Sequence, residues 1–312
     1  MDTRRLGGDG PALSVVGLGC NNFGMRIDRA ASAAVVNAAL DAGITHFDTA
    51  EIYGQGHSEE FLGAALGSRR DEAVIATKFA PRPADEPYVP GVLRQRILEG
   101  CERSLRSLGT DRIDLYYQHR PDDDASVEEA LETLDQLVRE GKVLHIASSA
   151  VPAAGIADAA RIAAASGLTR FCGTQLEWNL LSRDAEAEVI PAARKADVGI
   201  VPYFPLASGL LSGKYRAGEP FPEDSRLGAI SYFASVATDA NFARVASLTT
   251  FAEERGHTVL ELAIAWLAAQ EGVASVIAGA TRPEQVAANA RAAAWTLTPA
   301  DVAALDDLAE LT

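Results

Sequence analysis

The chain has 312 residues, of which 48% are hydrophobic and 23% are charged, so it has enough apolar material for a sizeable core. Its formal net charge of −15 disfavours nucleic acid or an anionic membrane as a partner, but it allows a local basic pocket for a phosphorylated cofactor. Cys20, Cys101 and Cys172 lie far apart without CxxC spacing, which argues against a disulfide framework or a metal site. Because no apolar run of about 18 residues occurs, we expect a soluble, cytoplasmic protein without a membrane segment.

From Val15 onward, short apolar runs typical of buried strands alternate with amphipathic stretches of helical period. We predict eight strands, over Val15–Leu18, Ile44–Phe47, Ala73–Ala76, Ile113–Tyr117, Leu144–Ala147, Phe171–Gln175, Gly199–Tyr203 and Ser275–Ala278. We predict eight helices that follow them, over Ala30–Asp41, Glu59–Leu66, Val92–Leu108, Val127–Arg139, Ala153–Ala165, Ala185–Lys195, Val259–Ala269 and Pro283–Ala293. This order is typical of a closed parallel (β/α)8 TIM barrel, and we expect one such α/β domain over residues 1–312.

Three segments lie outside this repeat. Arg4–Leu6 and Ala12–Leu13 flank a glycine-rich turn and predict an N-terminal β-hairpin that plugs the bottom of the barrel. More than fifty residues separate Tyr203 from Val259, which predicts a lid or a cofactor strap after the seventh strand. Val302–Leu311 predicts an extra C-terminal helix.

Serines mark two of the helix starts. Ser126 is followed by Val-Glu-Glu, the spacing of a capping box, and Ser58 precedes the second helical period. We therefore predict that Ser58 and Ser126 cap their helices.

A doubly wound open sheet is the main alternative fold. Such sheets usually carry a glycine-rich phosphate turn after the first strand, and glycines do occur over Gly17–Gly24. Their spacing is not GxGxxG, and no clear acidic strand end follows at the expected distance, so we reject this fold.

Ionisable side chains stand where consecutive predicted strands end. Asp48 ends the second strand with Tyr53 in the loop beyond it, Lys78 ends the third, and His119 ends the fourth. Because the carboxyl ends of barrel strands meet at one mouth, these four should converge. An ammonium beside a tyrosine favours the phenolate and is expected to lower a pKa of about 10 by roughly 1–3 units. We expect Asp48 to hold Lys78 charged, Tyr53 to donate a proton, and His119 to position a substrate carbonyl oxygen.

The stretch DTAEIYG at Asp48–Gly54, the lysine of TKF and the histidine of LYYQH together resemble the aldo-keto reductase superfamily over nearly the whole chain. The resemblance implies an NAD(P)H-dependent carbonyl reductase on a (β/α)8 barrel. It also implies that Asp48, Tyr53, Lys78 and His119 form the catalytic tetrad, with Tyr53 as general acid. The DTAE version resembles the bacterial and potassium-channel-β-like branches.

The resemblance further implies a set of cofactor-binding residues. These are Gly19, Cys20, Asp48, Ser149, Gln175, Tyr203, Pro205, Leu206, Gly209, Leu211, Lys214, Gly279, Thr281, Arg282, Gln285 and Asn289. Within this set, Ser149 is implied to bind the nicotinamide carboxamide, Tyr203 to stack on the ring, and the segment from Pro205 to Lys214 to strap the pyrophosphate. Ala150 and Ala278 replace an asparagine and a proline that are usual in the family.

Thr281 and Arg282, at the start of the last barrel helix, favour NADPH over NADH. A guanidinium, a hydroxyl and free helix-start amides form an anion site suited to the 2′-phosphate. Glu284 would disfavour that phosphate if it faced the ribose, so we expect it to point to solvent.

Phe23, Phe79 and Trp178 are expected to line an apolar mouth for an aldehyde or ketone. The expected partner is therefore a small carbonyl compound, with the protein a monomer or homo-oligomer. Two other functions compete. A Schiff-base aldolase would use Lys78 as nucleophile but leaves Gln175 without a role. A cofactor-sensing regulatory subunit, like the channel β-subunits, is the non-enzymatic alternative, which the intact tetrad disfavours.

Overall fold

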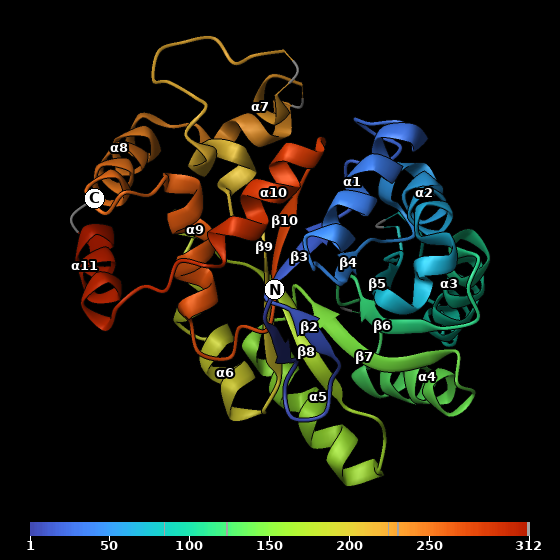
Figure 1. Ribbon diagram of the computed structural model, residues 1–312. Helices are drawn as coiled ribbons and strands as arrows, with labels where there is room; N and C mark the ends of the chain where they lie inside the picture. The colour runs from blue at the N-terminus through green and yellow to red at the C-terminus, as the bar shows by residue number, and fades with distance from the viewer. Residues whose placement is uncertain (84, 123, 224, 230, 311–312) are drawn as a thin grey trace.

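The computed structural model describes residues 1–83, 85–122, 124–223, 225–229 and 231–310. Its centre is an eight-stranded parallel sheet in the order β10-β3-β4-β5-β6-β7-β8-β9 (Figure 1). The strands are β3 (Val16–Gly19), β4 (His46–Asp48), β5 (Val74–Phe79), β6 (Ile113–Gln118), β7 (Val143–Ser149), β8 (Phe171–Glu177), β9 (Gly199–Tyr203) and β10 (Val276–Gly279). Ile200 N donates to Gly272 O and Ala274 N donates to Ile200 O, so β9 is joined to the segment that enters β10. The sheet is nearly closed, and the predicted (β/α)8 barrel is confirmed.

Helices surround the sheet on its outer face (Figure 1). Those that match the predicted repeat are α1 (Arg29–Asp41), α2 (His57–Leu66), α3 (Val92–Leu108), α4 (Val127–Arg139), α5 (Ala153–Ser166), α6 (Val189–Lys195), α9 (Val259–Ala269) and α10 (Pro283–Ala292). The long segment after β9 forms short helical turns and then α8 (Asp239–Glu253), beside which the extra C-terminal helix α11 (Pro299–Glu310) lies. Leu311, the predicted end of that last helix, lies outside the described residues.

Alternation along β5 explains how a strand serves both the core and the site. Ala76 belongs to the apolar cluster inside the barrel, and Lys78, two residues on, shares its face. Thr77 and Phe79 face outward, because Thr77 Oγ1 donates to Glu59 of α2 and Phe79 packs among buried residues of α3.

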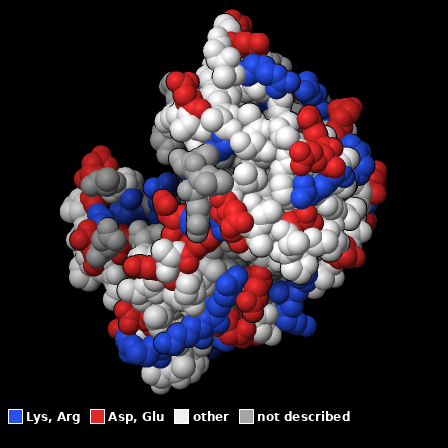
Figure 2. Space-filling view, turned by 90° about the vertical axis from the view of Figure 1, so that its left-hand side faces the viewer, with Lys and Arg blue, Asp and Glu red and all other residues white. Residues whose placement is uncertain are grey.

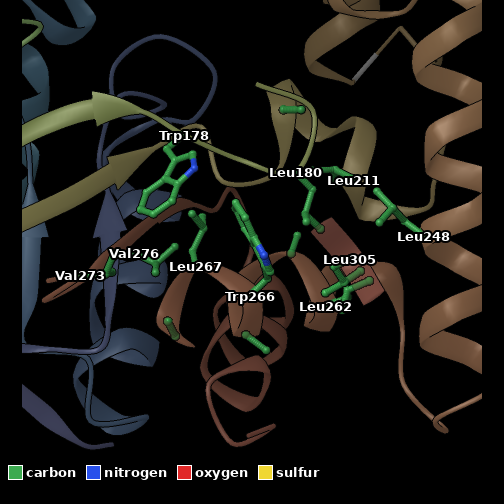
Figure 3. Packing of buried hydrophobic residues seen from close by; sticks show 14 of the residues in the cluster. Trp178, Leu180, Leu211, Leu248, Leu262, Trp266, Leu267, Val273, Val276 and Leu305 are labelled. Carbon is green, nitrogen blue, oxygen red and sulfur yellow. The ribbon is translucent and has the colours of Figure 1, made fainter. Parts of the chain in front are cut away.

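The largest apolar cluster of the described residues lies between the β8–β10 side of the sheet and helices α8, α9 and α11 (Figure 3). Trp178 and Trp266 meet edge to face there, with ring centroids 5.4 Å apart. Leu211, Leu248 and Leu305 extend the cluster toward the outer helices. Burial of this apolar surface anchors the long segment after β9 to the barrel.

The N-terminal hairpin forms as predicted, from β1 (Thr3–Arg5) and β2 (Ala12–Ser14). Leu6 is fully buried and belongs to the cluster inside the barrel. A Cβ at Gly173 or Gly199 would come within 2.6 or 2.7 Å of the Leu6 side chain, so the two glycines make room for it. Both glycines lie near the amino ends of their strands, which places the Leu6 plug at the bottom of the barrel as predicted.

Of the two predicted serine caps, one forms and the other does not. Ser126 caps α4, since its side chain accepts a hydrogen bond from Glu129 N at 3.1 Å. Ser58 does not cap α2, because the helix begins at His57 after Gly56, which has a φ of 92°. The Ser58 hydroxyl instead donates to Cys20 O at 2.8 Å and thereby joins α2 to the loop after β3.

The helix predicted over Ala185–Lys195 is shorter in the structure. A 3-10 turn, η3 (Asp184–Glu186), comes first, and α6 begins at Val189. In that turn, Glu186 accepts a hydrogen bond from Trp178 Nε1 at 2.8 Å and pairs with Arg183. These side-chain contacts hold the turn against the core and separate it from the helix.

Leu6→Ala should destabilise the protein by about 2–5 kcal/mol, because it empties a fully enclosed site at the bottom of the barrel. Denaturant unfolding measures the change. Leu144→Ala, at a leucine of β7 that is 43% exposed, is the matched control and should change stability by no more than about 0.5 kcal/mol. Equal effects for the two variants would contradict the plug.

Candidate active site

Three neighbouring strands carry the predicted tetrad to one end of the barrel. Asp48 is the last residue of β4, Lys78 is near the end of β5, and His119 follows β6 directly. Tyr53 opens a 3-10 turn, η1 (Tyr53–Gly56), in the loop after β4. The structure therefore brings all four residues together.

Lys78 and Asp48 form a buried ion pair. Lys78 Nζ lies 2.7 Å from Asp48 Oδ1 and also donates to Thr49 O at 2.7 Å, with side-chain exposures of 1% for Lys78 and 6% for Asp48. Gln175 Nε2, from β8, donates to the other Asp48 oxygen. Burial is the largest single effect and would lower the pKa of Lys78, but the Asp48 carboxylate and Tyr53 together outweigh it, so the pKa is raised and the amine is charged.

Tyr53 lies beside this ammonium. Lys78 Nζ is 3.5 Å from the Tyr53 hydroxyl and 4.9 Å from the centroid of its ring. We expected Lys78 to lower the pKa of Tyr53, and its charge does act in that direction. Burial is the larger effect, however, and the pKa is raised. Tyr53 is therefore a protonated phenol next to a fixed positive charge.

His119 completes the group. Its ring meets the Tyr53 ring edge to face, with centroids 5.8 Å apart. Burial, then the positive charges of Lys78 and Arg120, lower the pKa of His119 to about 3. A neutral imidazole carries one N–H donor and one acceptor. It can therefore donate a hydrogen bond to a carbonyl oxygen without itself being an acid at neutral pH.

Backbone strain is concentrated in the loops at this end. Five of the six described non-glycine residues with positive φ lie there, namely Gln55, Ala150, Phe204, Ala207 and Ser208. Such conformations cost of order 1–3 kcal/mol each and persist where the surrounding structure enforces them, as at binding sites. Ala150, which replaces the usual asparagine, has a φ of 55° directly after Ser149.

The remaining predicted cofactor residues line two sides of the same mouth. Ser149 and Gln175 are buried at the ends of β7 and β8, and Tyr203 is half-buried at the end of β9. Pro205 and Leu211 are buried in the segment that follows β9, whereas Leu206 and Gly209 are partly exposed. Cys20 is fully buried and its backbone N donates to Asp48 O at 2.8 Å.

Cationic groups border the strap and the start of α10. Lys214 and Arg282 are exposed, and neither forms an ion pair with any residue that the structure describes. Arg226, which sequence reasoning gave no role, donates to Asn21 Oδ1 at 3.0 Å and Asn22 Oδ1 at 3.3 Å. This links the segment after β9 to the loop after β3. The only sequence signal for it is an arginine at the end of a proline- and charge-rich stretch.

The start of α10 differs from the predicted anion site in one respect. The Thr281 backbone N and the Thr281 hydroxyl both donate to Gln285 Oε1, at 2.7 and 3.1 Å. We expected both groups to be free to bind an anion, and neither is. Arg282 is the N-cap residue and Glu284 is exposed, as predicted. The guanidinium and the positive helix end therefore carry any anion binding there.

Glycines stand at the neighbouring ends of β3 and β10. Gly19 and Gly279 are register partners across β3 and β10, so no side chain projects from either strand at that point. The nearest atom to a Cβ at Gly279 would be Asn22 Nδ2, at 3.3 Å. Asn289, another predicted cofactor residue, is buried in α10. Cationic side chains and the positive end of a helix are groups that bind a diphosphate anion.

The structure does not bring Phe23, Phe79 and Trp178 to the mouth. Phe23 packs against α1 and α2, and Phe79 faces α3. Trp178 is 1% exposed and packs on Trp266 (Figure 3). None has surface to offer a substrate, and we assign no substrate contact to them.

Three apolar side chains that sequence reasoning did not single out are exposed in loops at this end of the barrel. Met25, Ile52 and Val89 are 52%, 49% and 58% exposed, in the loops after β3, β4 and β5. The first two loops touch, because a Cβ at Gly54 would collide with Phe23 O. No sequence signal marks these residues, since isolated apolar residues in loops are common.

Taken together, the closed barrel and its mouth define an α/β-barrel enzyme with a buried Lys–Asp pair beside a tyrosine. The chain belongs to the aldo/keto reductase family, an oxidoreductase family whose model matches residues 15–310. It is 34% identical to a protein of Arabidopsis thaliana described as "Probable voltage-gated potassium channel subunit beta", over 94% of this chain and 91% of that protein. A protein of Oryza sativa subsp. japonica with the same description is 35% identical, over 94% and 91%. Within the described residues, no helix is long and apolar enough to cross a membrane.

A second histidine lies two residues before Asp48 on the same strand. His46 is fully buried, and its Nδ1 is 2.8 Å from Ser275 Oγ. Burial lowers its pKa to about 4; the Asp48 carboxylate opposes this shift, and the Lys78 charge adds a smaller lowering. It is therefore neutral in the folded protein at every pH above about 4.

Stability should fall as the pH drops from about 6.5 to about 4, because unfolded His46 binds a proton in this range and folded His46 does not. His46→Gln should remove about 3 kcal/mol of this dependence. Denaturant unfolding at several pH values measures it. An unchanged slope in His46→Gln would show that His46 is not the group responsible.

Proposed function

We propose that the protein is an NADPH-dependent carbonyl reductase that acts on aldehydes or ketones. The observation that carries this proposal is the buried Lys78–Asp48 pair, with Lys78 Nζ 3.5 Å from the Tyr53 hydroxyl. A charge fixed beside a phenol is what a tyrosine needs to release a proton, because the ammonium stabilises the resulting phenolate. The family's oxidoreductase character supports the same reaction.

The protein's own residues then act on the carbonyl oxygen. His119, neutral, donates a hydrogen bond that positions this oxygen near Tyr53. When bound, the reduced nicotinamide supplies a hydride to the carbonyl carbon. Tyr53 donates its proton to the oxygen, which completes the alcohol, and Lys78 stabilises the phenolate left behind. Asp48 and Gln175 hold Lys78 in place throughout.

The cofactor set supports NADPH rather than NADH. Arg282, Lys214 and Arg226 place positive charge around the strap and the start of α10 in a chain of net charge −15. A 2′-phosphate would take charge-assisted hydrogen bonds there, each worth about 1.5–3 kcal/mol. NADH lacks this phosphate and would bind more weakly.

A Schiff-base aldolase is disfavoured by the state of Lys78. Its pKa is raised and it is 1% exposed, so it is charged, ion-paired and a poor nucleophile. Borohydride in the presence of a carbonyl substrate should trap no Lys78 adduct.

The relatives named as channel subunits favour a second candidate function, a regulatory subunit that senses the cofactor. The two functions differ in turnover. Tight NADPH binding without reduction of any of a panel of aldehydes, ketones and sugars would support the regulatory subunit.

Tyr53→Phe should lower the rate of carbonyl reduction by about 10²–10⁴-fold, because it removes the proton donor, and should leave NADPH binding nearly unchanged. Steady-state kinetics and fluorescence titration of NADPH measure the two quantities. Tyr116→Phe is the matched control, since the Tyr116 hydroxyl donates to Ile97 O of α3 at 3.3 Å, outside the tetrad. Near-normal turnover in Tyr53→Phe would remove Tyr53 from the mechanism.

Arg282→Ala should reduce the preference for NADPH over NADH, and the reduction should be larger at low salt because the lost interaction is between charges. Titration of both cofactors measures it. Arg291→Ala, at the last turn of the same helix, is the matched control and should keep the preference. Equal affinity of the wild-type protein for both cofactors would contradict the assignment.

A further inference from the structure

His119 is held in an unusual way for a residue that must orient a substrate. A histidine in an active site commonly has one ring nitrogen fixed by a hydrogen bond from a carboxylate or a carbonyl. His119 Nδ1 is buried and has no hydrogen-bond partner among the residues that the structure describes. The placement of the ring therefore depends on the chain that carries it.

The backbone segment that carries His119 is held at Asp122, three residues after His119. Arg82 forms two parallel hydrogen bonds with Asp122, from Nε to Oδ2 at 2.8 Å and from Nη2 to Oδ1 at 2.9 Å. Arg82 also donates to Asp124 and to the Glu86 carbonyl. The side chains of Arg82 and Asp122 are 12% and 8% exposed, so this bidentate pair is largely shielded from water.

The pair joins the two loops that follow the catalytic strands. Arg82 lies four residues after Lys78 in the loop after β5, and Asp122 lies in the loop after β6. A second contact supports it, since Tyr88 of the first loop donates to Glu129 at the start of α4 at 2.7 Å. The loop after β5 is thus fastened across the loop that begins at His119.

We infer that Arg82 is a positioning residue, which holds Asp122 and thereby fixes the backbone that places the His119 ring beside Tyr53. Its importance for catalysis rests on the proposed function, but its effect on His119 does not. Release of Asp122 would let the loop after β6 move and would admit water to the ring.

The alternative is that Arg82 only stabilises the fold. A matched pair at the opposite end of the same two strands separates the two roles. Arg70 Nη2 lies 2.7 Å from Asp114 Oδ2, with side-chain exposures of 14% and 12%, and joins the segment before β5 to the start of β6. Loss of Arg70 should lower stability without reaching His119.

The test is the pH titration of the histidine ring protons by NMR in the full-length wild type, Arg82→Gln and Arg70→Gln, with the His119 signal assigned from His119→Gln. The groups that face His119 are Tyr53, Lys78 and Arg120, and both arginine variants retain them. In the wild type and in Arg70→Gln, His119 should stay neutral from pH 5 to pH 8. In Arg82→Gln its pKa should rise by at least about one unit toward the ordinary value of about 6.5, because the ring gains water.

Kinetics form the second readout. Arg82→Gln should lower kcat/KM for a carbonyl substrate by about 10- to 100-fold, the scale of a misplaced orienting group, while Arg70→Gln should not. The reciprocal variant Arg82→Asp with Asp122→Arg should restore part of the loss. If Arg82→Gln does not fold, Arg82→Lys keeps the charge but loses the two parallel bonds, and a smaller shift of the His119 pKa is expected.

An unchanged His119 titration in a folded Arg82 variant would overturn the inference, whether or not activity falls. A shifted His119 titration would support it even if the wild-type protein reduced no carbonyl compound, a result that would count against the proposed function alone.

Discussion

The charge of Lys78 is the constraint on which the mouth of the barrel depends. An ammonium that is 1% exposed is stable only with a partner, because the effective penalty for burying an ion is several kcal/mol. Asp48 on the next strand supplies the partner, and Gln175 from the far side of the barrel occupies the second oxygen of Asp48. The pair therefore ties β4, β5 and β8 together while it holds a positive charge against Tyr53.

Much of this arrangement could be predicted from the sequence because it follows from local rules. Strand length, period and the polar residue at each strand end are enough to place Asp48, Lys78 and His119 at one mouth. The same alternation also predicts that Phe79 faces outward, since its neighbour Lys78 faces the interior. We expected Phe79 to line the mouth. Successive side chains of a strand point to opposite faces, so Phe79 points outward, and the structure places it against α3.

What the sequence could not give depends on contacts between segments that are far apart. The bond between Arg226 and Asn21 and the pair between Arg82 and Asp122 each join two loops whose relative position is set only by the closed barrel. The pKa of Tyr53 is another case, because residue types suggest the effect of Lys78, but only the packed structure reveals that burial is larger. The position of Trp178 after a strand likewise suggests a residue at the mouth, and only the structure shows that it packs against Trp266 of α9.

We propose that reduction of a carbonyl group depends on the charged Lys78 beside Tyr53. Deuterium transfer from NADPH that carries deuterium at both C4 positions of the nicotinamide tests this in the wild type and in Lys78→Met, with a simple aromatic aldehyde as acceptor. Deuterium should appear on the alcohol carbon in the wild type, and the rate should be lower by about 10²-fold or more in Lys78→Met. An alcohol without deuterium in the wild type, or an equal rate in Lys78→Met, would contradict it.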